Sequence, residues 1–340
     1  MPIPTLPDSD RVVTRSALAI ALLAPLAAIV LHLVPALLAG LLIHSLVSSL
    51  APRLERHLSS HGARVAVVAG LALFVIAVAA ALTFAAMAFV HSDVGSLPAL
   101  MQKMADVLES TRAWLPDWAI ASLPADSSEL HTRAAAWLRE HASELQNIGK
   151  ETLRALAHAL IGMAIGALVA LREIDSAGTS GSLAKALSSH AAGFAAAFRQ
   201  VVFAQVQIAA VNAVLTGMYL VVGLGLFGIH LPLAKTMVVF TFVVGLLPIL
   251  GNLLSNTVIV VLSLSHSPDL ALLSLAFLVL VHKLEYFLNA RIVGNLIKAR
   301  TWELLLAMLV MEAIFGIVGL VMAPIYYAYL KNRLELRGWV

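Results

Sequence analysis

The sequence predicts an all-α, polytopic integral membrane protein, and three observations carry this prediction. Of the 340 residues, 61% are hydrophobic and only 12% are charged, whereas a soluble globular protein has roughly 25% charged residues. The length leaves room for about eight apolar segments of roughly 20 residues, the span of one bilayer-crossing helix. Long runs that alternate apolar and polar residues do not occur in the sequence, so helices rather than a barrel would satisfy the backbone in lipid.

Eight apolar segments follow one another along the chain, and we expect about six to eight of them to lie in the membrane. The first two meet at Val34-Pro35 and form either a tight hairpin or one kinked unit. Together they are too long for a cleaved signal peptide. The segments cover residues 16–34, 35–50, 65–90, 152–171, 201–227, 233–264, 270–288 and 303–330.

A polar insertion separates the third and fourth apolar segments. Residues 91–150 place apolar side chains at helical spacing and include three tryptophans of the kind that anchor helices at a membrane surface. We expect an extramembrane, amphipathic helical subdomain that packs on the membrane surface or on a neighbouring subunit. The chain then divides into residues 1–90 (N-terminal membrane segments), 91–150 (this subdomain), 151–200 (a span and a cytoplasmic loop) and 201–340 (a transport core).

The basic residues orient these segments through the positive-inside rule. They place the 172–200 and 283–300 connections in the cytoplasm, and this requires segment 233–264 to enter and leave on the outer side. A turn at Pro248–Asn252 leaves arms too short for two full spans. We therefore expect a re-entrant hairpin, broken where Pro248 removes a backbone donor and Gly251 disfavours a helix.

The last apolar segment must also be reconciled with basic residues on both of its sides. Both 283–300 and the C-terminal tail are basic, so 303–330 begins and ends inside if it is a hairpin, or places the tail outside if it is one span. We favour the hairpin, with Gly316 and Gly319 near its tip. A span plus a hairpin then occurs twice with opposite orientation, and broken helices in matching halves of a transporter indicate a midplane site. Pro248, Gly251, Gly316 and Gly319 would be the mobile gates.

Two acids lie in apolar surroundings, where a charge costs roughly 2.5–3.5 kcal/mol on insertion scales. Glu312 is either a protonatable or cation-coordinating group, or a solvated carboxylate at a hairpin mouth. For Glu285 we favour the structural explanation, because the neighbouring Lys283 suits an ion pair at a span end.

Neutral polar side chains complete the set of candidates. Gln205, Asn212 and Thr216 form one stripe of a helix, which indicates either interhelical hydrogen bonds or the lining of a path. Asn252, Ser255 and Asn256 follow the break at Pro248 and fit a water-exposed turn as well as a ligand-facing tip. Gly162 and Gly166 form a GxxxG pair, which predicts close helix packing.

The sequence lacks the residues and motifs that several kinds of binding or catalytic site require. The chain has no cysteine, so disulfides and thiolate sites are excluded. The net charge of +3 is spread along the chain and predicts no nucleic-acid partner. Nucleotide-binding, dinucleotide-binding and hydrolase motifs do not occur, and we expect no cofactor, no metal site and no enzymatic activity.

The C-terminal half resembles the autoinducer-2 exporter family of bacterial permeases. The resemblance lies in FRQVVFAQVQIAAVNAVLTGMYL (198–220), FVVGLLPILGN (242–252), HKLEYFLNARIVG (282–294) and EAIFGIVGLVMAPIYYAYLK (312–331), in this order. The N-terminal half agrees in layout. The resemblance implies a transporter in the bacterial inner membrane and a homo-oligomer, with a pentamer as one form.

These observations lead to one main hypothesis and its rivals. We expect a secondary transporter or exporter of a small solute or ion, with signalling molecules among the candidates, driven by a proton or sodium gradient through alternating access. Membrane lipid is the other expected partner. The rivals are a membrane scaffold whose 91–150 subdomain recruits partners, and a passive channel.

Overall fold

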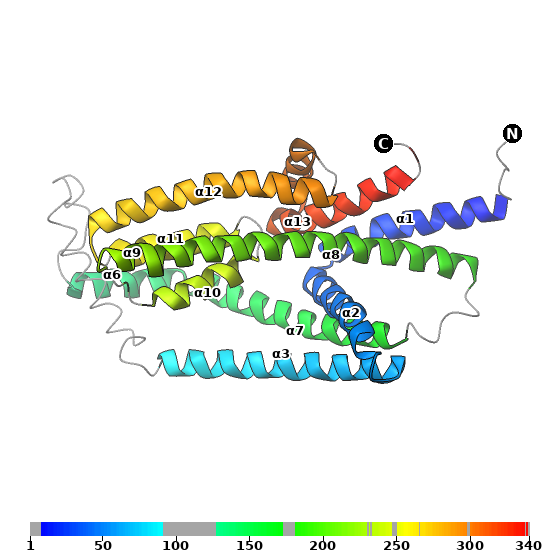
Figure 1. Cartoon of the computed structure of the whole chain (residues 1–340), viewed down its shortest axis with the longest axis horizontal. Helices are drawn as coiled ribbons and strands as arrows, with labels where there is room; N and C mark the ends of the chain where they lie inside the picture. The colour runs from blue at the N-terminus through cyan, green and yellow to red at the C-terminus, as the bar shows by residue number, and fades with distance from the viewer. Residues whose placement is uncertain are drawn as a thin grey trace. The chain divides into compact units, whose positions relative to one another are not determined.

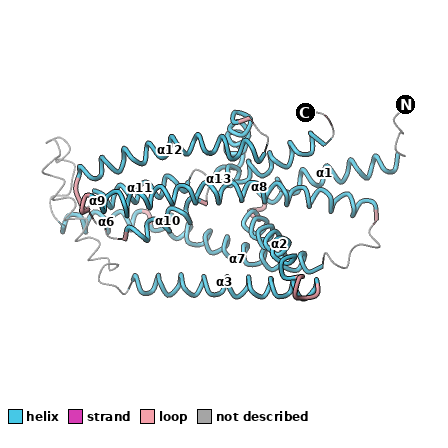
Figure 2. The backbone as a smooth tube through the Cα atoms, in the orientation of Figure 1, coloured by secondary structure: helices cyan, strands magenta, loops and turns pink. Residues whose placement is uncertain are grey.

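The computed structural model describes residues 8–90, 127–172, 181–229, 231, 233–246, 250–264, 266–297, 300–336 and 338. Within these ranges the chain consists of helices and loops with no strand, so the all-α prediction is confirmed (Figure 2). Six helices in the described part are long and apolar enough to cross a membrane. The predicted polytopic membrane protein is therefore supported by both composition and fold.

The first two apolar segments form separate helices. Helix α1 (Asp8–Val30) and helix α2 (Val34–Leu54) are joined by a short turn, and Pro35 lies in the first turn of α2, where its missing N–H costs no hydrogen bond. His32 in this turn has a positive φ of 57°. Its carbonyl lies 3.2 Å from His158 Nδ1, so a helix far along the chain helps to hold the turn.

Helix α3 (Ser60–Val90) covers the third apolar segment, and helices α6 (Ser127–Glu140) and α7 (Ala142–Arg172) follow the insertion. The part of the predicted extramembrane subdomain from 91 to 126 lies outside the described residues. Helix α7 runs without a break from the polar end of the insertion into the fourth apolar segment. Its amphipathic start and its apolar span are therefore one helix (Figure 1).

The GxxxG pair of α7 packs directly on α2. A Cβ at Gly162 would lie 2.0 Å from the carbonyl oxygen of Ala36, and one at Gly166 would lie 2.2 Å from that of Gly40. Only hydrogen fits at these two positions, so the predicted close packing is confirmed.

Helix α8 (Ser182–Gly217) starts earlier than the sequence indicated. We expected a cytoplasmic loop over 172–200, but from Ser182 onward this stretch is helical. The loop expectation was wrong because charged residues such as Lys185 and Arg199 do not end a helix, and the alanines between them favour helix. A π-helical segment (Met218–Gly223) and the short α9 (Leu224–Leu226) complete this element.

Segment 233–264 is a pair of short helices, as expected for a hairpin. Helix α10 (Ala234–Gly245) and helix α11 (Leu250–Leu264) have 12 and 15 residues, or about 18 and 22 Å, and neither reaches the roughly 30 Å of a bilayer core. The two arms meet tightly, since a Cβ at Gly251 would lie 2.3 Å from the carbonyl oxygen of Val244. Pro248 lies outside the described residues.

Helix α12 (Pro268–Ile297) extends past the predicted span end at 288. We expected a loop over 283–300, but Lys283 and Arg291 lie on the helix. A long basic side chain can reach the membrane surface from a helix, so these charges mark a side of the membrane without marking a loop.

Helix α13 (Thr301–Leu336) is a folded-back pair of arms, although its 36 residues would suffice for one long span. Lys331 Nζ lies 2.9 Å from Glu303 Oε2, whereas a separation of 28 positions would place them about 42 Å apart along a straight helix. The reversal occurs at Gly316, whose φ of 64° and ψ of −150° suit glycine alone. The structure thus supports the hairpin over the single span.

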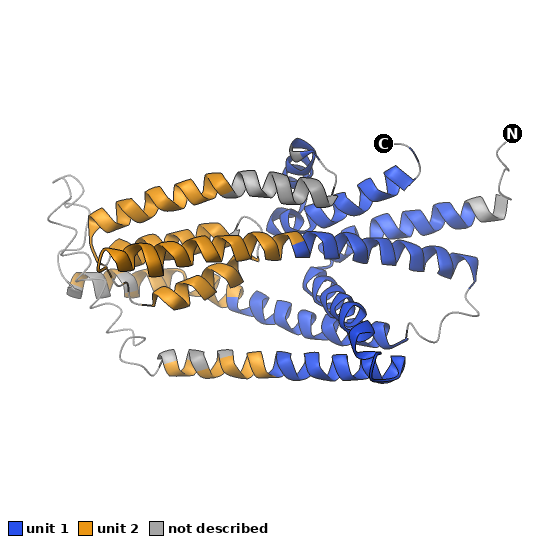
Figure 3. Cartoon of the chain, in the orientation of Figure 1, with its two compact units in different colours: residues 1–76, 149–203, 293–340 blue, residues 77–148, 204–292 orange. Residues whose placement is uncertain are grey.

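The chain forms two compact units, and the residue ranges that belong to them alternate along the sequence (Figure 3). Unit 1 comprises residues 1–76, 149–203 and 293–340, and unit 2 comprises 77–148 and 204–292. In unit 1 an apolar core gathers around Met322 and Tyr329, and in unit 2 another gathers around Leu224 and Ile259. The α10–α11 hairpin belongs to unit 2 and the α13 hairpin to unit 1.

Candidate binding pocket

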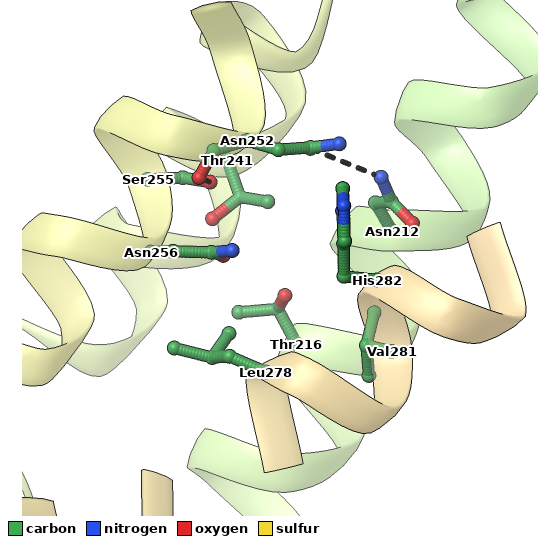
Figure 4. Close-up of a pocket in the computed structure, with 9 residues that line it drawn as sticks. All are labelled: Asn212, Thr216, Thr241, Asn252, Ser255, Asn256, Leu278, Val281 and His282. Atoms are coloured by element: carbon green, nitrogen blue, oxygen red, sulfur yellow. Dashed lines mark hydrogen bonds between the residues drawn. The ribbon is translucent and has the colours of Figure 1, made fainter. Parts of the chain in front are cut away.

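A small polar pocket lies inside unit 2, where the α10–α11 hairpin meets helices α8 and α12 (Figure 4). Seven of its nine lining residues carry polar side chains, although the four helices are strongly apolar. The lining residues are Asn212 and Thr216 from α8, Thr241 from α10, Asn252, Ser255 and Asn256 from α11, and Leu278, Val281 and His282 from α12. Five of these nine were candidate residues in the sequence.

Helix α8 contributes one edge of the pocket because Asn212 and Thr216 are four residues apart and therefore share a helix face. Both are buried, with exposed fractions of 5% and 2%. The side-chain nitrogen of Asn212 donates to Oδ1 of Asn252 at 3.2 Å, which connects α8 to the start of α11. The side-chain oxygen of Asn212 has no hydrogen-bond partner among the described residues.

Gln205 lies on the same stripe of α8, two turns before Asn212, but it does not line the pocket. Its side-chain nitrogen donates to the carbonyl oxygen of Gly245 at 2.8 Å. Gly245 is the last residue of α10, where helix carbonyls lack partners within the helix. Gln205 therefore fastens the broken end of α10 to α8, in agreement with the interhelical hydrogen-bond alternative.

Helix α11 contributes three residues from its first two turns. Asn252, Ser255 and Asn256 are spaced at i, i+3 and i+4, so one face of the helix carries all three. Ser255 is 1% exposed and its hydroxyl donates to the backbone oxygen of Asn252 at 3.3 Å. A water-exposed turn is therefore the wrong description of this stretch, which belongs to a packed helix beyond the turn.

Two polar lining residues were missed in the sequence. Thr241 is a single hydroxyl in the apolar run FTFVVG, and His282 follows twelve mostly apolar residues of α12. Neither stands out on its own helix, and only the packing of four helices brings them beside Asn212 and Asn256 (Figure 4). Thr241 is 3% exposed, and its side-chain oxygen has no hydrogen-bond partner among the described residues.

The size and charge of the pocket limit what it holds in this conformation. About 10 Å³ is open to the centres of water-sized molecules, which is room for roughly one water molecule. None of the nine described lining residues is Asp, Glu, Lys or Arg. The pocket therefore offers hydroxyl and amide groups, and one imidazole, to a small guest.

The remaining candidate residues lie elsewhere. Glu312 and Gly316 belong to the α13 hairpin in unit 1, and the Glu312 side chain is exposed there, one turn before the reversal. Gly319 is buried at the point where the arms touch, since a Cβ would lie 2.1 Å from the carbonyl oxygen of Met311. Glu285 lies on α12, and its side chain, like Pro248, falls outside the described residues.

One comparison with known proteins agrees with a membrane fold of apolar helices. The model of one protein family, described as AI-2E family transporter, matches residues 18–336. Comparisons with curated proteins and with solved structures returned no significant match. The family match covers nearly the whole chain, N-terminal half included, and agrees with the six long apolar helices. The chain therefore belongs to the AI-2E family of transporters and is a multi-pass membrane protein.

Proposed function

We propose that this protein is a secondary transporter of the bacterial inner membrane and that the pocket of unit 2 is its transport site. In this proposal a small solute or ion binds between α8, the α10–α11 hairpin and α12, and alternating access exposes the pocket to each side in turn. A proton or sodium gradient drives the cycle, because the sequence contains no nucleotide-binding motif. The hairpin breaks would act as the gates.

The observation that carries this proposal is the buried polar lining of the pocket. Asn212, Thr216, Thr241 and Ser255 are all at most 5% exposed, and a buried polar group costs free energy unless it is hydrogen-bonded. Two of the four keep a side-chain oxygen without a partner in the described part of the chain. Polar groups within membrane segments are candidates for substrate or ion sites.

The broken helix pair gives a second line of support. Irregular backbone at membrane depth is tolerated where it is buried in protein or lines a cavity, and discontinuous helices form the substrate sites of many transporters. Here the break between α10 and α11 lies directly beside Asn252 and Ser255. In the same proposal Glu312 is the coupling or charge-sensing group of the other hairpin.

Flux in proteoliposomes tests the proposal. The purified protein would be reconstituted, and uptake of candidate solutes, together with proton and sodium movement, would be followed under imposed gradients. Asn256→Leu should reduce flux at least tenfold, since it replaces the amide in the pocket by an apolar group of similar size. Thr257→Val on the same helix is the matched control, because Thr257 is exposed and its hydroxyl bonds to the Leu253 carbonyl of its own helix at 2.8 Å.

Two outcomes would overturn the proposal. Equal flux in Asn256→Leu and Thr257→Val would remove the pocket from the pathway, and an absence of saturation and counterflow would indicate a channel rather than a carrier. Glu312→Gln tests the coupling role separately. Unchanged gradient dependence in that variant would exclude it.

A further inference from the structure

The hydroxyl of Thr241 lacks the hydrogen bond that several other helical hydroxyls of this protein make, as does the hydroxyl of Ser45 on α2. A serine or threonine inside an apolar helix usually donates to the carbonyl of the residue four positions earlier. Thr83, Thr257 and Ser263 do so at distances of 2.8 to 2.9 Å. Thr241 makes no such bond, although it lies within α10 and is 3% exposed.

The Thr241 side chain is instead directed into the pocket. Figure 4 shows its oxygen on the side facing the amide of Asn256, with the hydroxyl of Thr216 across the same space. The three groups come from α10, α11 and α8, so three separate helices each contribute an uncharged oxygen to the lining of one pocket. The whole pocket, with its nine lining residues, has about 10 Å³ of space for water-sized centres, which admits a single small guest.

From this arrangement we infer that the pocket binds one dehydrated monovalent cation, with Thr241 Oγ1, Asn256 Oδ1 and Thr216 Oγ1 among its ligands. Hydroxyl and amide oxygens are the hard donors that suit such ions, and rings of neutral oxygens replace the hydration shell of alkali cations in channels. Divalent cations are disfavoured, because their protein sites use carboxylates and none of the described lining residues carries one.

The C-terminal end of α10 also favours a positively charged guest in the pocket. Thr241 lies one turn before Gly245, the last residue of α10, and the C-terminal end of a helix carries a partial negative charge. We expect the small space to favour sodium over potassium, because sodium is the smaller ion. The inference rests on the proposed function, in which this cation would occupy the transport site.

Salt-dependent thermal stability tests the inference without any transport assay. The purified full-length protein would be melted in detergent at constant ionic strength, with sodium, lithium, potassium or choline chloride as the salt. Because a ligand that binds the folded state raises the melting temperature, we expect sodium to stabilise the wild type in a saturable manner and choline to have no effect. Potassium should require at least tenfold higher concentration for the same shift.

Two variants of Thr241 locate the site. Thr241→Val removes the hydroxyl while preserving the shape, and it should weaken the sodium response at least tenfold, whereas Thr241→Ser should retain it. Thr257→Val is the control for a lost threonine hydroxyl on the same hairpin and should respond as the wild type does. Each variant should elute as the wild type does on gel filtration, and Thr241→Ser preserves the test if Thr241→Val does not fold.

The results separate this inference from the proposed function. A wild-type response that is equal in sodium and choline, or a full sodium response in Thr241→Val, would overturn the cation site and leave a pocket that holds water only. Solute flux in the same preparation would then still support a transporter. Conversely, a Thr241-dependent sodium response without flux in any gradient would support the site and contradict the transport proposal.

Discussion

The two helical hairpins of this protein are built alike at their turns but differ in what their polar groups contact. In both, a glycine without a side chain lets the arms touch: Gly251 lies against Val244 in the α10–α11 hairpin, and Gly319 lies against Met311 in the α13 hairpin. The first hairpin directs Thr241 and Asn256 into a pocket. In the second, several polar groups bond to each other or to neighbouring elements of unit 1.

Several hydrogen bonds and a contact with an aromatic ring hold the α13 hairpin in place. Glu303 in its first arm accepts hydrogen bonds from Tyr327 and from Lys331 in its second arm. The second arm is also bonded to its neighbours within unit 1, since Tyr326 donates to the Leu22 carbonyl at 3.2 Å and the Tyr329 hydroxyl lies 2.9 Å from His190 Nδ1. Arg333 lies over the Tyr329 ring and donates to the Ser189 carbonyl.

This difference distinguishes two hairpins that the sequence predicted to be mobile gates alike. Polar groups that already have protein partners stabilise a conformation, and buried oxygens without partners leave room for a guest. In our proposal the α10–α11 hairpin therefore contributes the binding groups, whereas the α13 hairpin is held in place by its own hydrogen bonds and by those to its neighbours in unit 1. Substitutions in the two hairpins should consequently have different effects.

The largest effects should come from the tight glycines, and they should be similar in both hairpins. Gly251→Ala and Gly319→Ala each force a methyl group against a carbonyl oxygen, which we expect to cost about 2 kcal/mol or more. Gly225→Ala is the control, since nothing lies within 4 Å of a Cβ there. Melting of the purified variants would measure the effect, and wild-type stability in either variant would contradict the described hairpin.

Gly316→Ala should be destabilising for a different reason. A Cβ at Gly316 has no atom within 4 Å, but its φ of 64° and ψ of −150° lie in a region that is essentially restricted to glycine. We expect a loss of about 1–3 kcal/mol from backbone strain alone. If Gly316→Ala melts as Gly225→Ala does, the reversal of α13 at this residue is wrong.

A smaller loss of stability should follow when the ion pair that joins the two ends of the α13 hairpin is removed. Lys331→Met removes the ion pair with Glu303, in which the two side chains are only 11% and 21% exposed. It should lower the melting temperature by less than Gly319→Ala does and leave the apparent affinity for sodium unchanged. Arg154→Met is the matched control, because its pair with Glu151 is exposed at 60% and 64% and should contribute little.

The outcome for Lys331→Met tests the division of tasks directly. A weakened sodium response with unchanged stability would reverse the roles that we assign to the two hairpins. Lys331→Arg, which keeps the positive charge, should restore part of the stability.

The smallest effect should come from the attachment of α10 to α8. Gln205→Leu removes one hydrogen bond to the Gly245 carbonyl, which is worth about 1 kcal/mol. Gln207→Leu on the same helix is the control, since Gln207 lies off the stripe that faces the hairpin. Equal melting temperatures of the two variants would show that Gln205 does not hold the end of α10.

Much of this fold could be predicted from the sequence because the signals are local. The break between α10 and α11 follows from Pro248 and Gly251 together with the distribution of basic residues, and Gly316 marks the reversal of α13. The start of α8 and the end of α12 could not be predicted in the same way. Charges such as Lys185 and Arg291 indicate a side of the membrane, and a helix can continue through them.

The pocket was predictable only in part. Asn212 and Thr216 share a helix face, and Asn252, Ser255 and Asn256 cluster after the break, so helical spacing alone identifies them. Thr241 and His282 are isolated on their own helices, and the convergence of α8, α10, α11 and α12 is a property of packing between segments far apart in the chain. The fastening of Glu303 to Lys331 is non-local for the same reason.

The central claim is that the pocket beside the α10–α11 hairpin opens to water during transport, and Ser255 is the residue that tests it. The chain contains no cysteine, so Ser255→Cys introduces a single thiol at a position that is 1% exposed in this structure. Thr257→Cys, two residues further on the same helix, is exposed outside the pocket and serves as the comparison.

The measurement is the rate at which a membrane-impermeant maleimide labels Ser255→Cys in intact cells and in inside-out vesicles, with sodium or choline chloride in the medium. We predict slow labelling of Ser255→Cys that sodium changes at least threefold, and no such sodium dependence at Thr257→Cys. Complete resistance of Ser255→Cys from both sides, with full labelling after denaturation, would show a pocket that never opens and would contradict the account.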